Sequence, residues 1–141
     1  MGRQMATRTA GERTAELASA PSSVTAARHL VRDDLIARGL PSRVVEDALV
    51  VVSELVGNAV RHARPLHRPR RSGVVMLRWD ASGPDVRIDV TDGGGSLRPH
   101  VEPPSLAETG GRGLAIVSAV ASDWGVISDG GQVTVFAVVS A

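Results

Sequence analysis

Glu54 and Asn58 are the first residues of this sequence whose types and spacing could carry chemistry. They are four residues apart, so on a helix both side chains lie on one face and within reach of a common ligand. A carboxylate and an amide oxygen there suit a hard cation and the activation of a water or hydroxyl. A solvated polar helix face is the simpler interpretation. Gly57 argues against it, because a glycine inside a helix costs about 1 kcal/mol and such a cost is expected where function overrides stability.

A second candidate is Asp92, which ends an alternating apolar pattern and precedes Gly93, Gly94 and Gly95. With no side chains after it to crowd a ligand, its carboxylate could accept a hydrogen bond from an exocyclic amine such as that of adenine. The alternative interpretation is an ordinary aspartate between a strand and a turn.

Residues 110–114, with the sequence Gly-Gly-Arg-Gly-Leu, form a third candidate. Their backbone N–H groups would be unblocked at a helix N-terminus, which favours phosphate binding, and Arg112 could add a charged fork to the same anion. Glycines also begin helices that bind no ligand. The segment is not a Rossmann fingerprint, because Ile116 stands where that motif needs glycine or alanine.

The composition limits how such groups could be used. All 16 basic side chains other than histidine are arginine, and the chain has neither lysine nor cysteine. This excludes a phosphate-binding loop that ends in Gly-Lys, Schiff-base chemistry, thiolate metal sites and disulfides. The net charge of +1 gives no general signal for nucleic acid or membrane. Any phosphate must therefore be held by arginine, backbone amides or a metal.

Periodicity predicts the elements that position these residues. We expect an N-terminal mobile arm over residues 1–20, with a short strand near Leu17, and one domain over residues 21–141. Ser42 is the predicted N-cap of the central helix. The predicted elements are a helix from Ser22 to Gly39, a helix over 42–63, a hairpin of 74–79 and 86–91, a helix over 110–122, and a hairpin of 124–128 and 132–139.

Two segments fall between these elements. Residues 61–71 contain several arginines with Pro65 and Pro69 and indicate an exposed basic loop. Nucleic-acid binding there is disfavoured because no aromatic residues interleave with the arginines, so a solvated loop or a protein-docking patch is the better interpretation. Residues 96–109 form a long segment without a clear element, which is typical of a functional lid or of disorder.

Targeting signals are missing from the sequence. No stretch approaches the roughly 20 apolar residues of a membrane span, and the N-terminus lacks the apolar segment of a signal peptide. We therefore expect a cytoplasmic protein that does not enter a membrane.

Taken together and in order, Glu-Leu-Val-Gly-Asn-Ala-Val-Arg-His-Ala at 54–63, Asp-Gly-Gly at 92–94 and Gly-Gly-Arg-Gly-Leu at 110–114 resemble the three nucleotide-binding boxes of the GHKL ATPase superfamily. The resemblance is to the branch of bacterial anti-sigma factor serine kinases and related actinomycete ATP-binding regulators. It covers about residues 21–139, including a Trp-Gly pair at 124–125 and the final hairpin.

The resemblance implies a Bergerat-type α/β fold, a two-layer sandwich whose mixed, mostly antiparallel sheet is covered on one face by about three helices, with ATP between the layers. It also implies roles for single residues. Glu54 would be the general base, Asn58 would bind Mg²⁺, and Asp92 would receive the adenine amino group. The remaining nucleotide contacts would come from Gly94, Gly111, Arg112, Gly113 and Leu114, with Thr134 near adenine and residues 96–109 as the lid.

The same resemblance implies a protein partner. In the kinase branch, the chain would phosphorylate a serine of an anti-anti-sigma-type antagonist. The alternative is a non-catalytic switch, in which nucleotide binding sets the affinity for a sigma factor or another partner; a homodimer is compatible with either. The sequence departs from the family pattern at Ser96, where another glycine is usual, and at Gln132, where that branch often has lysine.

Overall fold

The computed structural model describes residues 11–68, 71–95 and 111–141, which form six strands and three helices. The helices are α2 (Ser22–Ala37), α3 (Ser42–His62) and α4 (Gly111–Val120). The strands are β1 (Glu12–Ala18), β2 (Leu66–Arg68), β3 (Arg71–Asp80), β4 (Val86–Asp92), β5 (Asp123–Asp129) and β6 (Gln132–Val139).

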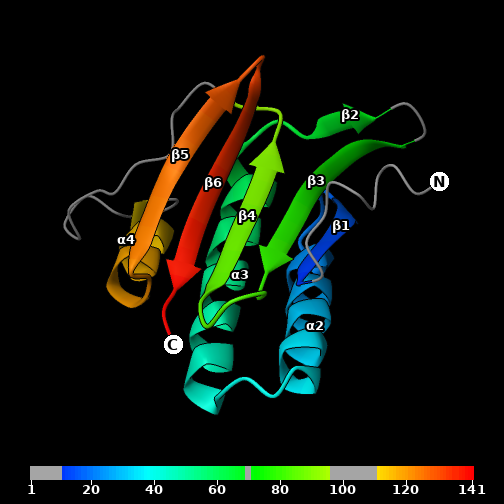
Figure 1. Cartoon of the computed structure of the whole chain (residues 1–141). Helices are drawn as coiled ribbons and strands as arrows, with labels where there is room; N and C mark the ends of the chain where they lie inside the picture. Colours follow the sequence, from blue (N-terminus) through cyan, green and yellow to red (C-terminus); the bar gives the residue numbers. More distant parts are fainter. Residues whose placement is uncertain (1–10, 69–70, 96–110) are drawn as a thin grey trace.

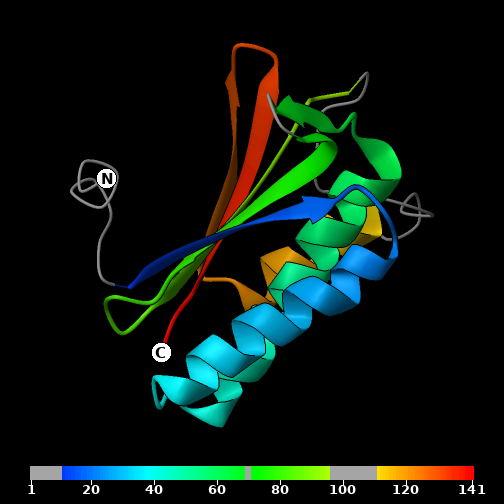
Figure 2. The same ribbon diagram turned by 90° about the vertical axis from the view of Figure 1, so that its right-hand side faces the viewer.

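The strands form one sheet in the order β1-β3-β4-β6-β5, and β2 pairs with the first residues of β3. Every pairing between the described strands is antiparallel. The three helices lie together on one face of the sheet (Figure 1, Figure 2). This is the two-layer α/β sandwich that the resemblance implies, and its described strands pair antiparallel throughout.

Strand alternation decides which side chains enter the core between the layers. On β4, Val86, Ile88 and Val90 are at most 1 % exposed and face the helices, while the residues between them face the other side of the sheet. The central helix α3 covers these strands with an apolar face at helical spacing. Its buried residues are Val44, Val45, Ala48, Leu49, Val51, Val52, Leu55, Val56, Gly57 and Ala59.

A polar contact at Asp34 ties α2 to the sheet. The indole Nε1 of Trp79 on β3 donates to Asp34 Oδ2 at 2.8 Å, and Arg38 Nε donates to the same oxygen at 2.8 Å. The buried indole N–H is therefore satisfied, as buried polar groups generally are. Since Trp79 is only 4 % exposed, this contact fixes α2 against the edge of the core.

The predicted helices and hairpins are confirmed, with small differences at their ends. Ser42 is the first helical residue of α3, and Pro41 occupies the N-cap position without a side-chain cap. The prediction of Ser42 as N-cap was therefore wrong by one position. Proline fits there because its missing N–H would have no helical partner. Within the described ranges, no helix combines the length and apolar character needed to cross a membrane.

The structure contains two strands, β1 and β2, that the sequence predicted only in part or not at all. Strand β1 pairs with β3 along its whole length, so the folded part of the chain begins before the predicted boundary at residue 21. Only Ala15 and Leu17 of β1 contact the core, and this short alternation indicated a strand near Leu17 but not its full extent. Strand β2 lies within the predicted basic loop, and its Leu66 is 4 % exposed. The predicted lid, residues 96–109, lies outside the described residues, as do residues 1–10 of the predicted arm.

Candidate functional site

Asp92 ends β4 on the side of the strand that faces the helices, and it is 5 % exposed. Its Oδ1 accepts a hydrogen bond from the Gly94 N–H at 2.7 Å. Burial raises the pKa of the Asp92 carboxyl above its usual value because the charged form loses water, and the Gly94 hydrogen bond acts in the opposite direction. No described residue donates to the other oxygen, Oδ2. That oxygen is therefore available to a donor on a ligand.

The glycines after Asp92 connect it to two other parts of the chain. The Gly93 N–H donates to the Arg64 carbonyl at 2.6 Å, and the Arg64 N–H donates to the Gly94 carbonyl at 2.7 Å. A Cβ at Gly93 would lie 2.6 Å from the Pro65 carbonyl oxygen. At Gly94, where φ is +81°, it would lie 2.9 Å from the Gly131 carbonyl oxygen. Only glycine fits both positions, so the loop is fixed between the segment after α3 and the β5–β6 turn.

The polar face of α3 carries Glu54 and Asn58, both partly exposed. Arg61 folds back along the helix, and its Nη2 donates to Asn58 Oδ1 at 3.3 Å. Gly57 makes room for this, because a Cβ there would lie 2.9 Å from Arg61 Nη1. Glu54 has no hydrogen bond or ion pair with any described residue. Its carboxylate thus lies one helical turn from the amide without a partner in the described part of the chain.

The third predicted segment forms the first turn of α4, which begins at Gly111. Leu114 is 3 % exposed and packs in the core with Val117, which fixes the start of the helix in the helical layer. The first N–H groups of any helix have no partner within it and carry the positive end of its dipole. The Arg112 side chain lies outside the described part of the structure.

These groups lie toward one end of the molecule. Helix α3 contacts both α4 and β4, and both α3 and β4 run toward the end at which α4 begins (Figure 1, Figure 2). The region therefore offers a buried carboxylate on β4, a carboxylate, an amide and a guanidinium on α3, and a helix N-terminus on α4. An amine-bearing base beside Asp92 and phosphates toward α4 and α3 would match these charges.

A magnesium ion fits the oxygen groups of α3 only with other ligands. No cluster of three or more histidine or acidic side chains is placed to hold a metal in the part of the chain that the structure describes. Mg²⁺ is usually bound through one or two protein oxygens, with substrate phosphates and water completing its octahedron. Asn58 and Glu54 thus suit a magnesium ion that arrives with a nucleotide.

Comparison with known protein families identifies the family of this chain. The sequence matches the family model of the histidine kinase-like ATPase domain over residues 17–138. The chain belongs to this family. It is a GHKL-type ATPase domain, and membership in a family of ATPase domains implies ATP binding. None of the curated proteins matches the chain significantly.

A solved structure shares the fold of this ATPase domain, that of the RsbU and RsbW domains of Rv1364c from Mycobacterium tuberculosis, with a TM-score of 0.68 and 21% identity over 92% of this chain. The histidine kinase domain of a blue-light activated kinase from Erythrobacter litoralis has a TM-score of 0.49 and 28% identity over 70% of this chain. The chain spans 32% of the first structure's chain and 45% of the second.

One residue predicted near adenine lies elsewhere in this ATPase domain. Thr134 on β6 pairs with Thr91 on β4, and their hydroxyl oxygens are 2.6 Å apart. Because neighbouring residues on a strand point to opposite faces, this pair lies on the side of the sheet opposite Asp92. The prediction that Thr134 reaches a pocket formed by Asp92 is therefore wrong.

Two contacts in the ATPase domain were not predicted from the sequence. Arg61 was assigned to the basic segment 61–71 and not to the site, although Gly57 was recognised as unusual; the glycine accommodates the guanidinium of Arg61. The backbone of Arg64 holds the glycine loop. No pattern in the sequence indicates this second contact, because it joins main-chain groups of segments far apart in the chain.

Proposed function

We propose that the chain is an ATP·Mg-dependent serine kinase that acts on a protein partner, of the anti-sigma factor kinase type. The observation that carries the proposal is Glu54, a carboxylate without a partner among the described residues, one turn from Asn58 on the helix beside the nucleotide region. The likeness of the three boxes to those of anti-sigma factor kinases supports the choice of an anti-anti-sigma-type protein as substrate.

Each proposed role follows from the chemistry of the group. Asp92 Oδ2 accepts a hydrogen bond from the adenine amino group, and its burial strengthens this contact because a charged acceptor in a desolvated site binds donors tightly. Gly94 orients the carboxylate from the other side. The amides at the start of α4 hold phosphate oxygens, with Arg112 in support.

The transfer step uses α3. The serine oxygen of the partner attacks the γ-phosphorus, the bond from that phosphorus to the β–γ bridging oxygen breaks, and Glu54 takes the serine proton. Asn58 holds the magnesium ion, which when bound neutralises the phosphate charge. Arg61 Nη2 donates to the same Asn58 oxygen, so magnesium binding requires this contact to open, after which the guanidinium supplies positive charge to the phosphates. Most of the rate enhancement then comes from positioning and charge neutralisation.

A non-catalytic switch is the second candidate. It is favoured by the contact of Arg61 Nη2 with Asn58 Oδ1, because this contact occupies the oxygen that magnesium needs. In that case nucleotide binding sets the affinity for a sigma factor or another protein, and no phosphate is transferred.

The test is phosphoryl transfer from labelled ATP to a purified anti-anti-sigma-type protein from the same genome, with ATP binding measured in parallel. We expect Glu54→Gln to lower transfer by about 10²-fold or more, the range for loss of a general base, while ATP binding persists. The matched control is Glu46→Gln, an exposed glutamate on the same helix. ATP binding without transfer by the wild type would favour the switch, and undiminished transfer in Glu54→Gln would refute the assigned base.

A further inference from the structure

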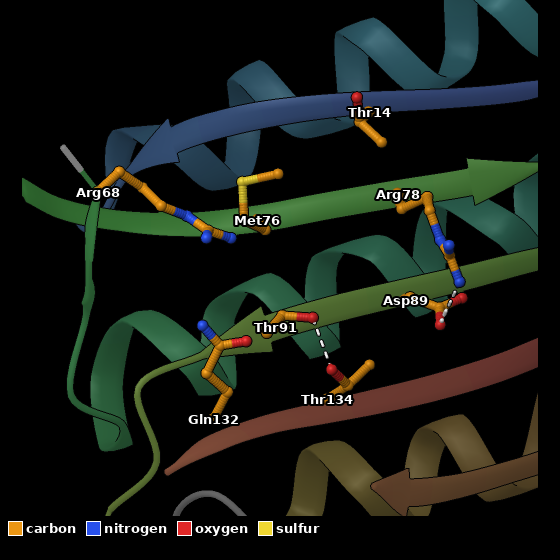
Figure 3. A pocket seen from close by; sticks show the side chains of 8 residues that line it. All are labelled: Thr14, Arg68, Met76, Arg78, Asp89, Thr91, Gln132 and Thr134. Atoms are coloured by element: carbon orange, nitrogen blue, oxygen red, sulfur yellow. Dashed lines mark hydrogen bonds and ion pairs between the residues drawn. The ribbon is translucent and has the colours of Figure 1, made fainter. Parts of the chain in front are cut away.

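The sheet face opposite the helices carries a groove of about 270 Å³ that the nucleotide site does not use. It is lined from β1, β2, β3, β4 and β6 by side chains that include Arg68, Met76, Thr91, Gln132 and Thr134 (Figure 3). Thr91 precedes Asp92 on β4, so the groove lies on the far side of the strand from the carboxylate assigned to adenine.

The acidic groups at one end of the groove are already paired. Asp89 is 5 % exposed, and its carboxylate is bound by Arg78 at 3.2 Å and by Arg87 at 3.0 Å. Arg78 also pairs with Glu12 at 3.0 Å. The Arg87 guanidinium stacks over Phe136, and its hydrogen bond to Asp89 raises its pKa further. The two arginines and the two acidic residues of this network therefore neutralise one another.

Arg68 differs from these arginines. It forms no hydrogen bond or ion pair with any described residue, and its Nε is buried without a partner. Figure 3 shows its guanidinium extending from β2 over Met76, along the groove. A buried N–H group without an acceptor is unfavourable unless a ligand supplies one. The groove therefore contains a cation whose donors are unused by the described residues.

Further donors surround this guanidinium. The Thr91 and Thr134 hydroxyl oxygens are 2.6 Å apart, and only one O–H can point between them. The other O–H has no acceptor among the described residues and can donate to a ligand. The Gln132 amide has no hydrogen-bond partner among the described residues and lies next to Thr91 (Figure 3). Donors thus exceed acceptors at the β2 end of the groove.

We propose that this groove is a second ligand site, which binds a small molecule bearing a carboxylate or phosphate group. Arg68 holds the oxyanion with a forked pair of N–H groups, and the Gln132 amide and the free threonine hydroxyl supply further donors. The volume is below that of sites for drug-sized ligands, about 300–1,000 Å³, which suits a small anion better than a second nucleotide. The site is independent of the kinase proposal.

The test is a titration of the ¹⁵N-labelled full chain, followed by NMR at constant ionic strength, with inorganic phosphate and with succinate as probes. We expect saturable shifts of the Thr91, Gln132 and Thr134 amides and of the Arg68 Nε–H resonance. Arg68→Gln should weaken binding by about tenfold or more, since a charge-assisted contact is lost. Arg32→Gln, at an exposed arginine on α2, is the matched control and should change nothing.

A second variant tests the charge of the groove independently of Arg68. Gln132→Glu keeps the size of an exposed side chain and adds a negative charge, so it should abolish the shifts. The proposal is overturned if sodium chloride alone produces the same shifts. It is equally overturned if Gln132→Glu or Arg68→Gln binds the probes as the wild type does, or if only residues near Asp92 and α4 respond.

Discussion

At the scale of single residues, Asp92 connects the stability of the fold with its function. Its carboxylate is nearly inaccessible to water, receives one hydrogen bond from Gly94, and leaves Oδ2 without a donor among the described residues. Burial of a charge with incomplete compensation costs stability. A ligand that donates to Oδ2 would offset part of this cost, which is the behaviour expected of a binding residue rather than of a structural one.

The raised pKa of Asp92 predicts a pH dependence of folding. The folded chain holds this proton more tightly than the unfolded chain, so the free energy of unfolding falls as pH rises from about 3.8 to the higher folded pKa and then levels off. Between these two pKa values, the free energy of unfolding falls by about 1.4 kcal/mol for each pH unit. Asp92→Asn lacks this titration but keeps an oxygen for the Gly94 N–H.

Urea unfolding of the wild type and of Asp92→Asn between pH 3.5 and 8 measures this effect. We expect the variant to gain stability relative to the wild type as pH rises through the interval. A difference that is constant with pH, or a wild type that becomes the more stable protein toward neutral pH, would show that Asp92 is not the desolvated carboxyl described above.

At the scale of elements, the glycine loop after β4 holds three segments together. Backbone hydrogen bonds join it to Arg64 after α3, and Gly94 approaches Gly131 in the β5–β6 turn. The helix with the proposed base and the strand with the proposed adenine acceptor are therefore fixed to each other through main-chain contacts. Displacement of the loop should affect both ends of the nucleotide region.

Gly93→Ala tests this connection. Its Cβ would lie 2.6 Å from the Pro65 carbonyl oxygen, and backbone cannot move aside as a flexible side chain can. We expect a loss of about 1–3 kcal/mol of stability, the usual cost of an overpacked site, together with weaker ATP binding. Chemical denaturation gives the first quantity and calorimetry the second.

Gly83→Ala is the control for the glycine loop. It lies in the β3–β4 turn, and a Cβ there would meet nothing within 4 Å. Its stability should differ from that of the wild type by no more than about 0.5 kcal/mol, as for most surface substitutions. Equal effects of Gly93→Ala and Gly83→Ala would mean that the close approach to Pro65 does not constrain the loop.

Elements with long periodic patterns could be predicted from the sequence, and short ones could not. Helix α3 was recognised because Val45, Leu49, Val52 and Val56 repeat at helical spacing over 21 residues. Strand β2 has 3 residues, and its one buried side chain, Leu66, gives no periodicity. Its position is decided by pairing with β3 after Pro65 ends the helix, which is a tertiary effect.

At the scale of the whole molecule, the two faces of the sheet have different chemistry. The helical face holds the apolar core and, at one end, Asp92 and the polar residues of α3. The other face holds the Asp89 ion network and the groove at Arg68. A strand such as β4 contributes to both, with Thr91 on one side and Asp92 on the other.

This division explains which parts of the site the sequence could predict. Glu54 and Asn58 are related by helical spacing, and Asp92 is marked by the glycines that follow it, so local patterns identified them. Thr134 was assigned to the wrong face because its side depends on the register between β4 and β6. The sequence of either strand alone does not contain that register.

The central claim is that Asp92 forms the adenine end of an ATP site, and calorimetric titration with Mg·ATP tests it most directly. We predict measurable binding by the wild type and by Asp85→Asn, a control at an exposed aspartate just before β4. For Asp92→Asn, which should remain folded, we predict an affinity lower by about tenfold or more, because a hydrogen bond to a charged acceptor is lost. Wild-type affinity in folded Asp92→Asn would contradict the account and place the nucleotide elsewhere.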